Sequence, residues 1–180
     1  MWNLSRSRVN VSKSSAVAAL CSQCALCCNG VLFADVRLQA GDDAARLQSL
    51  GVKLREGRAT ARFNQPCSCL DGKLCRIYPD RPMRCRTFEC RLLQRTQSGE
   101  VGEGTALKKI AKAHRCAEDV RRILRALGDT DEAVPLSRRY QRMMRRAIDL
   151  SADEKQIELR GELMLAVSRL VGILEQDFLG

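Results

Sequence analysis

The residues of this chain with the clearest chemical potential are its cysteines. Nine of the ten lie between positions 21 and 90. Two thiols spaced C-x-x-C can turn toward one ion, because a tight turn brings their sulfurs together. Two such knots far apart in sequence can close a site between them, so the spacing predicts metal binding. The first knot is Cys21, Cys24, Cys27 and Cys28, and the second segment holds Cys67, Cys69, Cys75, Cys85 and Cys90.

The wider pattern resembles a known family. After the C-x-x-C-x-x-C-C knot come P-C-x-x-L and C-x-I-Y-x-x-R-P-x-x-C-R-x-F-x-C, which are similar to the YkgJ-type family of small bacterial cysteine-cluster proteins. That family is described as zinc- or iron-chelating. The resemblance covers Cys21 to Cys90 and leaves Cys69 and Cys116 outside the pattern, where small buried side chains are expected. It implies eight metal ligands: Cys21, Cys24, Cys27, Cys28, Cys67, Cys75, Cys85 and Cys90.

The ligand set leaves the metal open between zinc and iron–sulfur. Eight thiolates fit two tetrahedral zinc ions, two iron–sulfur clusters, or one site with thiols left over. The C-x-x-C-x-x-C run favours a cluster such as [4Fe–4S] in the first knot, whereas a weak core favours structural zinc. Adjacent Cys27 and Cys28 diverge, so we expect them to serve neighbouring sites, or one of them to lie outside the metal's ligands.

Two arginines are expected to assist the metal. Arg81 and Arg86 flank the predicted ligands, where a cation lowers the pKa of a thiol and offsets the charge of a cluster. The alternative is that they are solvated or pair with carboxylates at a helix end. His114 is the only histidine. It lies two residues from Cys116 on a predicted helix, where the two side chains do not face each other, so we do not expect it to be a ligand.

No catalytic motif accompanies the cysteines: G-x-S-x-G, a phosphate-binding glycine loop and H-E-x-x-H are all missing. We therefore expect binding, delivery or redox sensing rather than a self-contained enzyme. One alternative is a component of an iron–sulfur-dependent modification or redox enzyme, because flagellin lysine methylases carry a similar knot. A third is a basic nucleic-acid-binding module, although the arginine runs at 121–125 and 137–146 have few aromatic residues beside them.

Composition favours metal over disulfides. The N-terminal twenty residues lack the apolar run of a secretory signal, so a cytoplasmic address is expected, where thiols stay reduced. The formal net charge is +10. Two divalent ions held by eight thiolates would lower it to about +6. Nothing in the sequence reaches the length of a membrane span.

The predicted helices and strands that position the thiols are short up to about residue 100, and the predicted helices after it are long. Alternating residues predict strands at 31–38 and 59–63, and turn and capping residues predict helices at 42–50 and from Pro82 to about Gln97. Three amphipathic helices should follow. The first ends at Gly128, the second is capped by Ser137, and the third runs from a capping box at 151–154 to about Asp177.

The sequence therefore predicts a mostly helical α+β protein in three parts. Residues 1–20 form a flexible basic arm, 21–100 form a cysteine-cluster metal-binding domain with short strands, and 101–180 form a C-terminal bundle of about three helices. Residues 163–174 are apolar around most of the helix. We expect this helix to be covered by the other helices, by a second subunit or by a protein partner.

Overall fold

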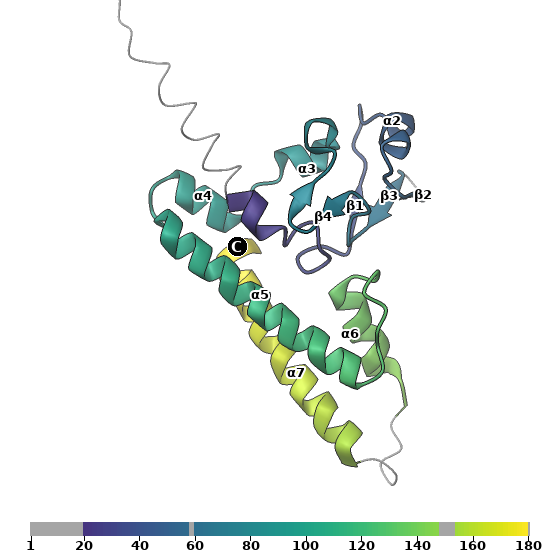
Figure 1. Cartoon of the computed structure of the whole chain (residues 1–180), viewed down its shortest axis with the longest axis vertical. Coiled ribbons are helices and arrows are strands. Elements are labelled where there is room, and N and C mark those ends of the chain that lie inside the picture. The colour runs from purple at the N-terminus through teal and green to yellow at the C-terminus, as the bar shows by residue number, and fades with distance from the viewer. Residues whose placement is uncertain (1–19, 58–59, 148–153, 180) are drawn as a thin grey trace, which may run out of the picture.

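The computed structural model describes residues 20–57, 60–147 and 154–179. Short strands and helices gather at one end of the molecule, and two long helices run side by side away from them (Figure 1). The predicted class, α+β and mostly α, is confirmed. The predicted basic arm and most of the capping box at 151–154 lie outside the described residues.

The strands form two small antiparallel sheets. In the first, β3 (Arg62–Asn64) lies between β1 (Asp35–Arg37) and β2 (Leu54–Arg55), with Val36 and Leu54 opposite Phe63. In the second, β4 (Leu70–Asp71) pairs with β5 (Leu74–Cys75) across a turn that contains Gly72. The strands predicted at 31–38 and 59–63 are therefore present but shorter. A compact apolar core lies beneath them: Val36, Leu38, Leu47, Val52, Phe63, Cys69 and Ile77.

The short helices follow their capping residues. α2 (Ala44–Ser49) begins where Asp43 Oδ1 accepts a hydrogen bond from the Arg46 N–H, at 2.8 Å. The single helix predicted from Pro82 to Gln97 is instead two, α3 (Met83–Thr87) and α4 (Arg91–Gln97). Phe88 and Cys90 are extended between them. Phe88 packs edge-on against Phe33, with ring centroids 4.9 Å apart, and this contact accompanies the break.

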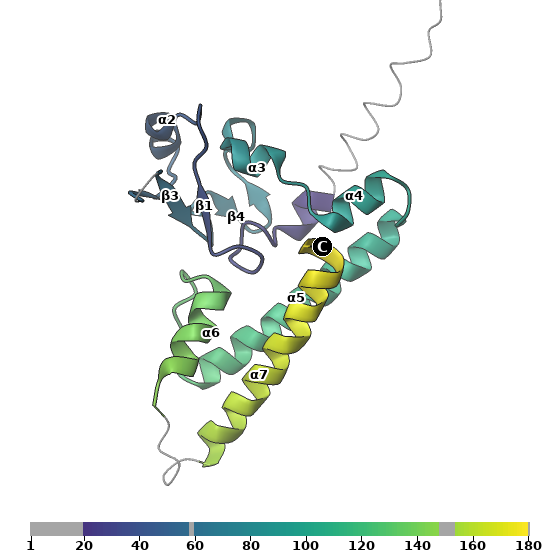
Figure 2. The same ribbon diagram turned by 180° about the vertical axis from the view of Figure 1, so that it is seen from behind.

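Three helices and a final turn build the larger core. They are α5 (Glu103–Ala126), α6 (Leu136–Arg145), α7 (Glu154–Leu174) and a π-helical turn, η2 (Glu175–Leu179). α7 packs along α5 in both views (Figures 1 and 2). The core that they form also includes Leu20, Leu26 and Val31 from the cysteine region. The division of the chain near residue 100 stays a prediction, and this shared core crosses it.

Three arginines of α6 form ion pairs within the chain. Arg139 is 1% exposed and its Nε donates to Asp129 Oδ1 at 3.0 Å. Arg142 also pairs with Asp129, and Arg138 Nη2 donates to Asp35 Oδ2 at 2.7 Å. Pro135, rather than the predicted Ser137, is the N-cap of α6. These arginines therefore fasten α6 to its loop and to β1, and are not free to contact phosphates.

α7 is covered on one side only. Leu163, Ala166 and Leu170 are buried against the core, whereas Met164 and Leu165 are 52% and 66% exposed. Within the chain, other helices therefore cover only one side of residues 163–174. No helix of the described residues is long and apolar enough to cross a membrane.

Gly30 lies where three parts of the chain meet. Its φ is +79°, and its carbonyl accepts a hydrogen bond from the Leu136 N–H at 2.9 Å. A Cβ atom there would lie 3.2 Å from both Pro135 Cα and Pro66 Cδ. Only glycine satisfies both the left-handed backbone and the close approach.

We predict that Gly30→Ala destabilises the fold by about 2 to 4 kcal/mol, because left-handed strain and overpacking add. Gly41→Ala is the matched control, since Gly41 has φ +90° with no atom within 4 Å of an added Cβ. It should cost only about 1 to 2 kcal/mol, the backbone part of the penalty. Urea unfolding of both variants measures the difference. Equal losses would show that the approach to the two prolines is unimportant.

Candidate metal centre

The two cysteine segments meet through the backbone. Residues 20–24 form a helical turn, Ala25 takes a left-handed φ of 53°, and a second turn follows at 26–30. The Cys67 N–H then donates to the Cys28 carbonyl at 2.9 Å. This bond places the start of the second segment directly against the end of the first knot.

The second segment delivers its cysteines from four different places. Cys67 precedes β4, Cys75 ends β5, Cys85 lies in α3 and Cys90 is the residue before α4. Cys69 is fully buried in the smaller core, and its thiol donates to the Leu50 carbonyl at 3.6 Å. Its packing matches the structural role expected for a cysteine outside the pattern.

The first group of thiols surrounds a small apolar cavity. Cys21, Cys24, Cys27 and Cys90 line a cavity of about 50 Å³ together with Leu26, Leu92 and Phe178. Cys21, Cys27 and Cys90 each raise the pKa of Cys24, so the four thiols are electrostatic neighbours. We call Cys21, Cys24, Cys27 and Cys90 the first tetrad.

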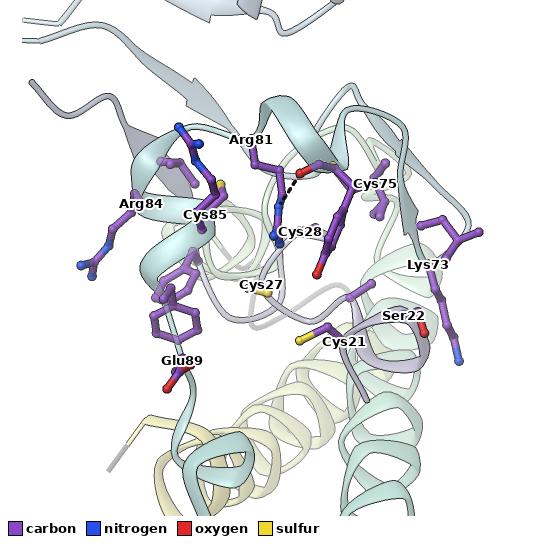
Figure 3. A pocket seen from close by; sticks show the side chains of 18 of the residues that line it. Cys21, Ser22, Cys27, Cys28, Lys73, Cys75, Arg81, Arg84, Cys85 and Glu89 are labelled. Atoms are coloured by element: carbon purple, nitrogen blue, oxygen red, sulfur yellow. Dashed lines mark hydrogen bonds between the residues drawn. The ribbon is translucent and has the colours of Figure 1, made fainter. Parts of the chain in front are cut away.

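The remaining four predicted ligands form a second group. The pKa of Cys28 responds to Cys67 and Cys85, and that of Cys85 responds to Cys67 and Cys75. Three of these thiols, Cys28, Cys75 and Cys85, line a larger cavity of about 440 Å³, which Cys21 and Cys27 of the first tetrad also line (Figure 3). We call Cys28, Cys67, Cys75 and Cys85 the second tetrad. Within the described residues, no three Cys, His, Asp or Glu side chains already stand in a finished metal-binding arrangement.

Burial keeps most of these thiols protonated. Loss of solvent raises the pKa of Cys21 and Cys67 to about 11 and that of Cys24 and Cys85 to about 12. The pKa values of Cys75 and Cys90 are raised for the same reason. Cys27 is the exception, because a hydrogen bond from the Cys28 thiol lowers its pKa to about 7 and raises that of Cys28. A metal that binds here must displace protons from most of its ligands.

Arg81 lies between the two tetrads. Its Nε donates to the Tyr78 carbonyl at 2.9 Å, and its guanidinium lies 3.6 Å from the centroid of the Tyr78 ring. From this position Arg81 lowers the pKa values of thiols in both tetrads, among them Cys27 and Cys85. Figure 3 shows its side chain reaching down toward Cys28 and Cys27. Arg86 is exposed and lines the larger cavity without being a source of any thiol shift.

The larger cavity has an excess of positive charge. Asp35 in its wall is already paired with Arg138, which leaves Glu89 as the other acidic group. None of the five basic side chains in the wall forms an ion pair with the described part of the chain. They are Arg37, Lys73, Arg81, Arg84 and Arg86.

Three contacts that support the cysteine region could not be predicted from the sequence. His114 on α5 bonds the Cys24 carbonyl through Nε2 at 2.7 Å, so the one histidine contacts the backbone of the first knot. Asp42 Oδ1 accepts the Met83 N–H at 2.7 Å and thereby caps the helix that holds Cys85. An ion pair between Asp177 and Lys109 lies beside Phe178, which lines the cavity of the first tetrad. These contacts join residues 90, 41 and 68 positions apart, and no local motif marks them.

Comparison with known proteins gives one match. The model of the CxxCxxCC family, described as "Putative zinc- or iron-chelating domain", matches residues 20–117, more than half of the chain. The matched range contains both tetrads and the first part of α5. No curated protein and no solved structure matches the chain.

We predict that Cys27 is the first of these thiols to be alkylated near pH 7 in the reduced, metal-free protein, because its pKa of about 7 leaves a substantial thiolate fraction. Cys28→Ala removes the hydrogen bond that lowers this pKa. Alkylation of Cys27 at pH 7 should then slow by about tenfold or more. Iodoacetamide pulses between pH 6 and 9, read by peptide mass spectrometry, measure the rates.

Cys116→Ala is the control for this experiment, since Cys116 lies on α5 outside both tetrads. It should leave the Cys27 rate unchanged. An unaltered Cys27 rate in Cys28→Ala would show that the thiol–thiol hydrogen bond does not set the reactivity.

Proposed function

The chain belongs to the CxxCxxCC family, and from this premise we propose that it is a metal-binding protein with two separate thiolate sites. The first tetrad supplies one site and the second tetrad supplies the other. We describe it as a chelating protein of the YkgJ type, which binds and delivers metal and does not carry out catalysis by itself.

The observation that carries this proposal is the division of neighbours Cys27 and Cys28. Cys27 lines the small cavity with Cys21, Cys24 and Cys90. The pKa of Cys28 responds first to its hydrogen bond with Cys27 and also to Cys85 and Cys67, which belong to the second tetrad. The two thiols share a hydrogen bond, so the two sites would lie next to each other, with one knot contributing three thiols to the first site and its last thiol to the second. The eight predicted ligands then divide into two sets of four, the number that a closed zinc site or an iron–sulfur cluster requires.

The charges around the sites support the same reading. A divalent ion with four thiolates carries a net charge of about −2, so two such sites carry about −4. The five unpaired cations in the wall of the larger cavity are suited to offset this charge. Arg81 does so for both sites, since it already favours thiolates in each tetrad.

The two sites differ in their access to solvent. In the first tetrad, Cys24 and Cys90 face only the cavity of about 50 Å³, whereas Cys27 and the exposed Cys21 also line the cavity of about 440 Å³. In the second tetrad, Cys28, Cys75 and Cys85 open onto the larger cavity. The more enclosed set favours structural metal, and the more accessible set favours exchange. We therefore assign the fold-stabilising metal to the first tetrad and the exchangeable metal to the second.

Metal analysis of single-cysteine variants tests the division. Protein purified without oxygen should hold about two zinc equivalents, or iron with acid-labile sulfide, per chain. Cys90→Ser should lose the metal of the first site and Cys85→Ser that of the second, while the Cys116→Ser control retains both. An absorbance near about 400 nm that dithionite bleaches identifies iron–sulfur. Loss of all metal from both variants, or one equivalent in the parent protein, would contradict two independent sites.

Metal affinity should also depend strongly on pH. The pKa values of Cys67 and Cys85 are raised to about 11 and about 12, so both are protonated at neutral pH and lose their protons on binding. Each proton released makes the dissociation constant fall by about tenfold per unit rise in pH. Competition with a chelator of known pH dependence between pH 6 and 8 gives this slope. An affinity that does not change with pH would exclude binding through these thiols.

A further inference from the structure

The face of α7 that points away from α5 carries an apolar stripe without cover. Ile157, Met164, Leu165 and Val171 are 38%, 52%, 66% and 41% exposed. Three of them, Ile157, Met164 and Val171, recur every seven residues, so they lie along the same side of the helix. In Figure 2, α7 lies in front of α5 and no other helix crosses it.

Small residues alternate with these large ones. Gly161, Ser168 and Gly172 lie along the same exposed stripe. A Cβ atom added at Gly161 or Gly172 would meet no atom within 4 Å. A second helix can therefore approach closely here, with its large side chains over the small positions, as packed helices require.

Two charged residues at one edge of the stripe indicate which partner could bind there. Glu162 and Arg169 are exposed and lie on the same edge, and neither forms an ion pair with the described residues. Seven residues of helix separate them by about 10.5 Å, and no ion pair joins them in the described part of the chain. The chain thus presents an acid and a base on one edge that another helix could satisfy.

A second copy of α7, running antiparallel, satisfies both. A two-fold axis near residues 165 and 166 places Glu162 of each copy opposite Arg169 of the other, on the same side of the pair. A parallel pair would place this charged edge against the uncharged edge of the other helix. Complementarity of charge therefore favours the antiparallel arrangement, and the small positions of the stripe leave room for the side chains of the second copy.

We propose that the chain forms a homodimer through antiparallel pairing of α7. The interface is self-complementary, as two-fold symmetry demands, and each Glu162–Arg169 contact occurs twice. This proposal is independent of metal binding, because the exposed side of α7 carries no cysteine.

Charge exchange tests the pairing in the full, metal-loaded chain. Sedimentation velocity over a wide concentration range should show a monomer–dimer equilibrium. Glu162→Arg and Arg169→Glu should each weaken the dimer by at least about tenfold, because two attractive contacts become repulsive. The double variant carrying both changes should recover to within about threefold of the parent, since the pairs re-form with reversed signs.

Lys112→Glu, a comparable charge change on the exposed side of α5, should leave the dissociation constant unchanged. Circular dichroism and metal content should match the parent protein in every variant. A chain that stays monomeric at all concentrations overturns the proposal. A dimer that ignores the single changes, or that the double variant weakens further, overturns the antiparallel register.

Discussion

The hydrogen bond from the Cys67 N–H to the Cys28 carbonyl joins the two halves of the cysteine region. It brings together segments separated by almost forty residues, and Gly30 permits the close packing of Pro66 and Pro135 beside it. The Leu136 N–H extends the same junction to α6. The positions of both tetrads and of the helical bundle depend on this one crowded point, where a side chain larger than hydrogen has no room.

Burial of thiols and excess positive charge oppose one another in the free protein. Desolvation favours neutral thiols, as the raised pKa of Cys85 shows, whereas Arg81 favours thiolates. Metal binding satisfies both effects. The metal replaces the protons of the thiols, and the resulting thiolates place negative charge beside the unpaired cations. This region has a small apolar core of seven buried residues. Metal binding would add to the free energy of folding where hydrophobic burial is limited.

Local patterns in the sequence predicted the fold class, the cysteine clusters, the helix α2 and the end of α5 near Gly128, because each depends on residues close together in the chain. The assignment of thiols to sites could not be read in this way. Cys90 joins the first knot across more than sixty residues, and His114 reaches Cys24 across ninety. The break at Phe88 and the burial of Arg139 also depend on distant partners, Phe33 and the α5–α6 loop. Helix propensity and amphipathic pattern contain no information about such contacts.

Phe178 is added to the chain after the thiols of the first tetrad have been made. It closes the small cavity around Cys24 and Cys90, and Asp177 fixes its turn to α5. The ribosome makes Phe178 after every cysteine of the chain. At ordinary elongation rates, about 5 to 20 seconds pass between the emergence of Cys90 and that of Phe178. The four thiols are thus complete before Phe178 exists, so metal can reach Cys24 and Cys90 in the nascent chain from the side that Phe178 later covers.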